Sequence, residues 1–361
     1  MKRNIKLKLS LMLSLFIAIL TSCVNEDEHK DAQVHKGEEV AVKLVVSLGS
    51  SPQTRATEST EADAVGNEYK IFQEDFQVLL YNADGSYRTQ VVITQCKRSA
   101  YNQYVLEGKF FTFRDTDKDK LFKMVVIANA EQGSAKIVPR DWQANLSEAH
   151  LYKQLKFSYD NGEMFTVDIL KDNADNPERI PMWGSKTTPI TDGATYHITL
   201  IRALAKITVH VAPSIASQSR ITNVTMQQSS TSGMLTPKNA ANHSESYTIN
   251  QANGADELNI PSDVAYSPTN LPFASYLKDG KKYFCLYIPE QVAHEANSGQ
   301  GARMVITIDG ENYPVEITHP ILRNNWYSYV VQSVTPRHAS IEVKYQVAEW
   351  EERDPCDIFY N

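Results

Sequence analysis

Few residues of this 361-residue chain have the types and spacing that would bind a metal or catalyse a reaction. Asp115, Asp117 and Asp119 alternate as at the start of a calcium-binding loop. The segment lacks the glycine of the sharp turn, however, and has Val126 in place of the bidentate glutamate. No nucleophile elbow, HExxH motif, phosphate-binding glycine loop or CxxC motif is present. The sequence therefore predicts a solvated charged turn at the aspartates, no metal site, no cofactor and no enzymatic activity.

Cys23 is the residue for which the sequence predicts a chemical modification. Four basic residues and an apolar run at residues 9–20 precede it, as in a secretion signal, and the run is too short to span a membrane. The segment LTSC, residues 20–23, resembles the lipobox of bacterial lipoproteins, whose cysteine is diacylated before the signal is removed. We therefore expect residues 1–22 to be a lipoprotein signal peptide and Cys23 to carry diacylglycerol and palmitate. The alternative is an ordinary signal peptidase site beside a chance cysteine.

Charge limits the partners of the chain. The net charge is −7, and removal of residues 1–22, which hold four basic and no acidic residues, changes it to −11. Nucleic acid is not an expected partner, because binding it requires clustered Lys and Arg. Residues 23–37 form an acidic linker in which Glu26, Asp27 and Glu28 resemble the tags that send some lipoproteins to the outer face of the outer membrane. The alternative is a plain solvated linker.

The other three cysteines are too few and too scattered for a metal cluster or a disulfide framework. Cys96 and Cys285 lie in apolar runs and are predicted to be small core residues of strands. Cys356, close to residue 361, either pairs with another chain or stays free.

Period-two alternation dominates the sequence and predicts a mostly β protein. The first strand, residues 38–48, places five apolar side chains on one face: Val40, Val42, Leu44, Val46 and Leu48. The last, residues 340–347, does the same with Ile341, Val343, Tyr345 and Val347. Other clear strands are predicted at residues 76–81, 104–113, 122–129, 220–227, 282–289, 303–309, 313–319 and 325–334.

Many short strands with few helices predict two packed sheets per domain, a β-sandwich. Residues 172–195 are rich in Pro, Gly, Asp and Asn, which indicates a connection between domains at residues 38–192 and 193–361. In residues 201–211 the odd positions are apolar, whereas Arg202, Lys206, Thr208 and His210 point the other way, toward solvent, which predicts one half-buried antiparallel strand. A short helix is predicted near residues 145–155, where Leu146, Leu151 and Leu155 form a loose stripe.

Phrases spread over nearly the whole mature chain are similar to those of the fimbrillin family, the lipoprotein-derived pilins of type V pili in anaerobic Gram-negative bacteria. Besides the lipobox, they are TRAT at residues 54–57, FQVLLYNADGSY at 76–87, VVIANA at 125–130, IPMWG at 180–184, RALAKITVHV at 202–211, GMLTP at 233–237 and LRNNWYSYVV at 322–331. The resemblance implies two tandem transthyretin-like β-sandwich domains.

The resemblance also implies maturation by an arginine-specific protease that cuts after an N-terminal strand. Arg55 matches the family's cleaved arginine by position, and Ala56 would become the new N-terminus, with residues 38–55 excised. Residues 49–61 are mostly small and polar, which suits an exposed loop that a protease can reach. The alternative is that Arg55 is an ordinary loop arginine.

Excision of the first strand would leave a groove with an apolar floor and unpaired backbone groups on both sides. An extended segment of another subunit can fill such a groove by strand addition. The strand at residues 340–347 has the alternation of a donor; the alternative is a plain structural strand of the second domain. Because donor and acceptor lie at opposite ends of the chain, the contact would be head-to-tail and would generate a filament.

The sequence thus predicts a subunit of a surface fimbrium, or pilus, that serves cell adhesion or biofilm formation by donor-strand exchange. Its partners would be other fimbrial subunits, the processing protease and the outer membrane through lipid. Shaft, tip and anchor positions stay open, since an anchor would keep its lipid and escape cutting. The rivals are a monomeric surface lipoprotein that binds a glycan through loops such as residues 239–263, and a hydrolase with an unrecognised site.

Overall fold

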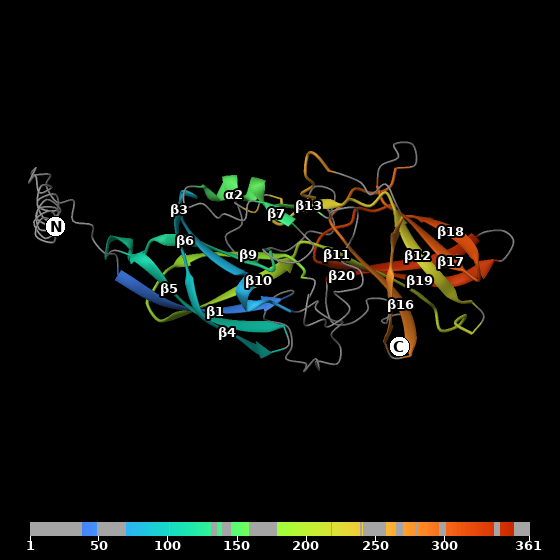
Figure 1. Ribbon diagram of the computed structural model, residues 1–361, viewed down its shortest axis with the longest axis horizontal. Coiled ribbons are helices and arrows are strands. Elements are labelled where there is room, and N and C mark those ends of the chain that lie inside the picture. The colour runs from blue at the N-terminus through green and yellow to red at the C-terminus, as the bar shows by residue number, and fades with distance from the viewer. Residues whose placement is uncertain are drawn as a thin grey trace, which may run out of the picture. The chain divides into compact units, whose positions relative to one another are not determined.

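The structure, a computed structural model, describes residues 38–48, 70–100, 102–113, 115–130, 136–138, 146–158, 179–217, 219–238, 240, 258–264, 270–278, 280–295, 301–335 and 340–349 (Figure 1). All of them belong to one compact unit, Glu38–Asn361. None of the helices in these ranges is long and apolar enough to cross a membrane. Strands hold most of the described residues, which confirms the predicted mostly-β class.

The N-terminal sheet has eight strands in the order β3-β2-β6-β9-β10-β1-β5-β4. Their bounds are β1 Glu38–Leu48, β2 Phe76–Asn82, β3 Tyr87–Gln90, β4 Val92–Ala100, β5 Gln103–Phe113, β6 Leu121–Ala128, β9 Met182–Pro189 and β10 Ala194–Arg202. A turn at residues 82–85 joins β2 to β3, and Gly85 in it has a φ of 78°, which favours glycine.

Strand β10 belongs to both halves of this sheet. Residues 194–200 pair with β1, while Ile201 and Arg202 pair with Trp183 and Met182 of β9. A strand that changes partners in this way makes the corner of a sandwich. The two halves, β10-β1-β5-β4 and β3-β2-β6-β9, enclose buried side chains from both, among them Val46, Leu106, Val78, Met124 and Leu200.

The C-terminal part contains a five-stranded sheet, β15-β16-β11-β19-β20, and a four-stranded sheet, β14-β12-β17-β18. The bounds are β11 Ala205–Val211, β12 Ile221–Gln227, β14 Leu271–Pro272, β15 Ala274–Lys278, β16 Lys281–Ile288, β17 Arg303–Ile308, β18 Glu311–Glu316, β19 Asn325–Thr335 and β20 Ser340–Glu349. The pairing is mainly antiparallel; β1 with β10 and β11 with β19 are parallel pairs.

A small three-stranded sheet, β13-β8-β7, is built from β7 Lys136–Val138, β8 Lys156–Ser158 and β13 Ser232–Met234. The predicted helix is α2, Glu148–Gln154, and Ser147 caps its N-terminus. Leu151 and Leu155 of the predicted stripe are buried, while Leu146 is half-buried. Two short 3₁₀ turns, η2 Gln73–Asp75 and η3 Asp115–Asp117, complete the described elements.

The prediction of one half-buried strand at residues 201–211 is wrong. The strand is interrupted at Ala203 and Leu204. There β10 of the eight-stranded sheet ends and β11 of the five-stranded sheet begins. Arg202, Lys206 and His210, predicted to face solvent, are at most 1% exposed. Apolar and polar side chains do alternate along β11. However, β11 lies between β16 and β19 and is covered on both faces, so the alternation does not mean that its polar side chains face solvent.

The division into domains at residues 38–192 and 193–361 stays a proposal. The sheet topology favours a join about ten residues later, because β10 pairs with β1 and β9 of the N-terminal sheet. Residues 203–204 are then the natural connection between the two sets of sheets.

Candidate functional site

Three predicted site residues lie outside the part of the chain that the structure describes: Cys23, Arg55 and Ala56. The signal peptide at residues 1–22 and the linker at 23–37 lie outside it as well. Their roles stay predictions. The strands predicted to be excised and donated, β1 and β20, are both described, and they differ strongly in how they are held.

Strand β1 lies inside its sheet, with neighbours on both sides. It runs parallel to β10 and antiparallel to β5, so that Val46 stands opposite Ile198 on one side and Tyr104 on the other. Its five alternating apolar side chains are buried, with exposed fractions of 0–8%. Burying five such side chains contributes on the order of 10 kcal/mol before entropy. β1 is therefore a structural centre of the N-terminal sandwich.

Bonds at both ends fix the register of β1. The Ala41 amide donates to Asp192 Oδ1 at 2.8 Å, and the Gly193 amide donates to the Ala41 carbonyl at 2.9 Å. At the other end the Leu48 amide donates to the Asn102 carbonyl at 2.8 Å. A one-residue slip would turn the apolar face away from the core. Any segment that takes the place of β1 must therefore match its alternation.

Strand β20 is an edge strand and is less deeply buried. It pairs only with β19, and its Ile341, Val343 and Val347 are half-buried against the core, while Tyr345 is 46% exposed. An edge strand can leave its sheet by breaking one ladder, whereas β1 would break two. Of the two predicted strands, β20 is thus the more easily detached.

An aromatic cluster holds β20 against the sheet. The ring of Tyr345 stacks on His319 with centroids 4.4 Å apart and on Tyr329 at 5.5 Å, and His319 also stacks on Tyr327 at 5.2 Å. His319 Nε2 lies 2.9 Å from the Tyr329 hydroxyl and Nδ1 lies 3.1 Å from the Pro320 carbonyl. Burial lowers the pKa of His319 and raises that of Tyr329. The cluster therefore favours an uncharged imidazole.

Acidification is expected to destabilise the C-terminal sheet through His319. Its folded-state pKa lies below the ordinary 6.5, because burial disfavours the charged ring. The contribution to stability is complete above pH 6.5 and is lost as the pH falls from there through the lowered pKa. His319→Phe keeps an aromatic ring but cannot titrate. In urea unfolding at pH 7.5 and 5.5, the fall in midpoint should be smaller for His319→Phe; equal falls would contradict this role.

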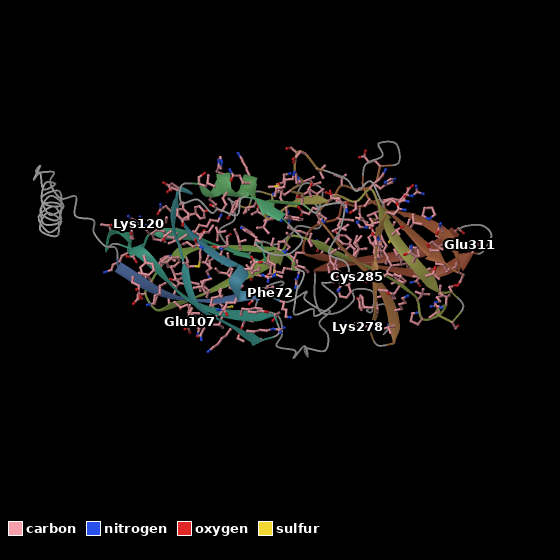
Figure 2. The ribbon with its side chains drawn as sticks, in the orientation of Figure 1. Phe72, Glu107, Lys120, Lys278, Cys285 and Glu311 are labelled. Carbon is pink, nitrogen blue, oxygen red and sulfur yellow. The ribbon has the colours of Figure 1, made fainter. Side chains whose placement is uncertain are left out.

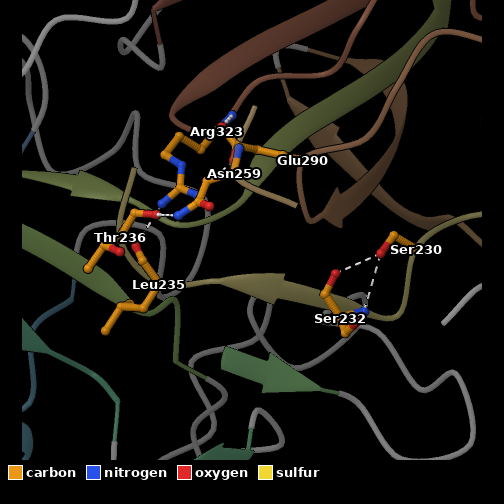
Figure 3. Close-up of polar contacts among 7 residues, drawn as sticks. All are labelled: Ser230, Ser232, Leu235, Thr236, Asn259, Glu290 and Arg323. Carbon is orange, nitrogen blue, oxygen red and sulfur yellow. Dashed lines mark hydrogen bonds and ion pairs between the residues drawn. The ribbon is translucent and has the colours of Figure 1, made fainter. Parts of the chain in front are cut away.

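A buried polar network fixes the loops at the end of the five-stranded sheet (Figure 3). Arg323 Nη2 and Glu290 Oε2 form an ion pair at 2.7 Å, and Arg323 Nη1 donates to the Leu235 carbonyl at 2.7 Å. The backbone N–H of Asn259 donates to Glu290 Oε2 at 3.0 Å, and its side-chain Nδ2 donates to the Thr236 carbonyl at 2.8 Å. The network ties the GMLTP and LRNNWYSYVV phrases together, which gives both a structural reason.

Close packing explains two glycines of these phrases. A Cβ on Gly233 would lie 2.6 Å from Phe157 Cζ and 2.9 Å from Pro289 Cβ, so β13 can approach β8 only without a side chain there. A Cβ on Gly184 of IPMWG would collide with the Thr199 carbonyl oxygen of β10. Both glycines therefore have a packing reason.

Sequence reasoning missed a clamp on the chain just after the predicted cleavage loop. Asp75 accepts from Arg179 Nη1 at 3.1 Å and from the Ala130 amide at 2.9 Å. Asn129 accepts from the Phe72 amide at 3.1 Å and donates to the Lys70 carbonyl at 2.8 Å. The only sequence signal was the asparagine at position 129 within VVIANA. Asn129 has a positive φ of 59°, a conformation that asparagine tolerates better than most residues. The clamp would hold the chain from residue 70 onward even if β1 were removed.

Among the residues that the structure describes, no group of three or more His, Cys, Asp or Glu could hold a metal ion. The prediction of a solvated charged turn is wrong for Asp117, which is buried and pairs with Arg88 at 2.6 Å and with Lys120 at 3.3 Å. Cys285 is a buried strand residue, as predicted, whereas Cys96 is a strand residue that is only half-buried.

Comparison with solved structures finds similar chains at low sequence identity. A candidate adhesin of Bacteroides thetaiotaomicron VPI-5482 has a TM-score of 0.43 at 10% identity, covering 87% of this chain and 99% of that one. A candidate cell adhesion protein of Bacteroides eggerthii DSM 20697 has a TM-score of 0.42 at 14% identity, with coverages of 87% and 97%. A candidate polysaccharide-binding protein of Bacteroides thetaiotaomicron VPI-5482 has a TM-score of 0.36 at 11% identity, with coverages of 86% and 96%.

A comparison with curated protein sequences finds no match. Residues 73–354, most of the chain, match the family described as fimbrillin-A associated anchor proteins Mfa1 and Mfa2. The match includes every described strand except β1. Because this match covers more than half of the chain, it shows that the chain belongs to the family of fimbrillin-A associated anchor proteins Mfa1 and Mfa2.

Proposed function

We propose that this protein is a structural subunit of a surface fimbrium that is exported as a lipoprotein through Cys23, cut after Arg55 and polymerised by donor-strand addition. The observation that carries the proposal is the position of β1, which is N-terminal in the chain yet central in its sheet. Its removal would leave β5 and β10 facing each other across an apolar slot with unpaired backbone groups, and only another strand fills such a slot well.

Two further observations support the same function. The clamp formed by Asp75, Asn129 and Arg179 ties residues 70–75 to residues 129–130 and 179–180 without using β1, so these contacts do not depend on the strand that would be excised. Strand β20, an edge strand held by one ladder and an aromatic stack, is a suitable donor. The partners are then other fimbrial subunits, an arginine-specific protease and the outer membrane through lipid. Adhesion or biofilm formation is the role of the resulting filament.

The family description favours a second candidate, a fimbrial anchor that does not polymerise. An anchor would keep β1, so that its own slot stays filled, and would keep the lipid on Cys23. The structure with β1 in place is the form that both candidates share before any cleavage. Cleavage after Arg55 separates them, since only the polymerising subunit requires it.

Arg55→Ala is expected to abolish maturation in the native host. The wild-type protein sheared from the cell surface should begin at Ala56 by N-terminal sequencing and intact mass, whereas the variant should stay in the membrane fraction with a lipidated Cys23. Arg98→Ala, at an exposed position of β4, is the matched control and should mature normally. Wild-type protein found only in the membrane fraction, uncut, would overturn the polymerising subunit and leave the anchor.

A further inference from the structure

The outer face of the five-stranded sheet is buried although many of its side chains are polar. Because side chains alternate along a strand, this outer face lies on the side of the sheet opposite Ile207 and Val209. The nine side chains of this outer face form three rows across β16, β11 and β19: Tyr287–Lys206–Trp326, Cys285–Thr208–Ser328 and Tyr283–His210–Val330. Each is at most 3% exposed. The outer face of a sandwich sheet ordinarily meets water, so this burial means that a further segment of chain covers it.

Contacts within the outer face show what kind of segment fits. The Lys206 ammonium lies 4.1 Å from the centroid of the Trp326 ring, and Trp326 Nε1 donates to Thr208 Oγ1 at 2.8 Å. Figure 2 labels Cys285, the neighbour of Thr208 in the middle row. A buried ammonium is costly unless carboxylates or other oxygens compensate it. The covering segment is therefore expected to carry acidic as well as apolar side chains.

The two ends of the outer face differ. At the Val330 end, Ile215 of the loop after β11 packs on Ala212 and Val330. At the Lys206 end the chain itself leaves the sheet, because residue 348 of β20 pairs with Trp326 and residue 349 pairs with Asn325. The residues that follow β20 thus start beside the row that contains Lys206.

We infer that residues 350–361 of the same chain dock on the outer face. Their sequence, WEERDPCDIFYN, carries four acidic residues and one basic residue, together with Trp350 at one end and Ile358, Phe359 and Tyr360 near the other. Twelve extended residues reach about 40 Å, whereas β16, β11 and β19 together span about 10 Å at the usual strand spacing. The segment has the charge, the apolar content and the reach to cover the face from the point where β20 ends.

Docking of residues 350–361 on the outer face would hold β20 in the sheet by a second set of contacts, in addition to the aromatic stack of Tyr345. This consequence alone rests on the proposed function: β20 could serve as a donor strand only after the docked segment had left the outer face. The docking itself requires neither cleavage nor assembly, so it can be tested on the uncut monomer, separately from the test at Arg55.

Alkylation of Cys285 tests the docking. Native full-length protein and a chain ending at Glu349 are treated with iodoacetamide, and peptide mass spectrometry follows each cysteine. The shortened chain should label at Cys285 about tenfold faster or more, because labelling of a covered thiol requires local opening. Cys96, half-buried on β4, is the internal control and should label equally in both chains. Unchanged protection of Cys285 would assign the cover to another part of the chain and overturn the inference.

A second measurement in the intact chain guards against misfolding of the shortened one. Carbodiimide joins an amine to a carboxylate in contact, so it should link Lys206 to one of the acidic residues of the segment, Glu351, Glu352, Asp354 or Asp357. Changing all four to the corresponding amides should remove the link and speed Cys285 labelling while Cys96 is unaffected. A Lys206 link to any other segment would contradict the inference.

Discussion

Leu44→Ala is expected to lower the free energy of unfolding by about 2–5 kcal/mol. Leu44 is 1% exposed and lies at the middle of β1, where its backbone stands between Tyr196 of β10 and Leu106 of β5. Removing its side chain leaves a cavity between strands that are held on both sides, so the site can collapse little. Equilibrium unfolding in urea, followed by circular dichroism, measures the loss.

Lys43→Ala is the matched control for this prediction. Lys43 is the preceding residue of the same strand and is exposed, so its truncation should change the free energy of unfolding by about 0.5 kcal/mol or less. Equal effects at both positions would mean that β1 is not packed into the sandwich. The proposed acceptor slot would then have no apolar floor, and strand addition would lose its driving force.

Arg323→Met is expected to cost about 3–5 kcal/mol, because it leaves the Glu290 carboxylate buried without its cation. Arg323 is 1% exposed and Glu290 is 4% exposed, and their 2.7 Å ion pair joins the loop before β19 to the end of β16. The Leu235 carbonyl would lose its donor as well. Thermal or urea unfolding of the variant at pH 7.5 gives the loss directly.

The double variant Glu290→Gln/Arg323→Met separates charge from shape. It removes both charges, so it should recover part of the stability that Arg323→Met loses. A double variant at least as unstable as Arg323→Met would show that the ion pair contributes through packing alone.

The sequence by itself determined the strands and the fold class. Period-two alternation is a local property, because successive side chains of a strand point to opposite faces. It therefore located β1, β12, β16, β19 and β20 within a few residues of their observed bounds. The helix α2 followed from its leucine stripe, and the family from short phrases whose packing reasons became visible only in the structure, as at Gly184 and Gly233. The chemistry predicted at Cys23 and Arg55 rests on sequence alone.

Only the tertiary structure decided which strands are neighbours and which faces are covered. Residues 42–48 of β1 meet residues 194–200 of β10, and Glu290 meets Arg323; such pairings join distant parts of the chain and leave no periodic signal between them. The same holds for β11, whose alternation suggested a solvent face at Lys206 and His210 that the fold buries. Alternation reports that a strand has two unlike faces, but what each face meets depends on elements placed there by folding.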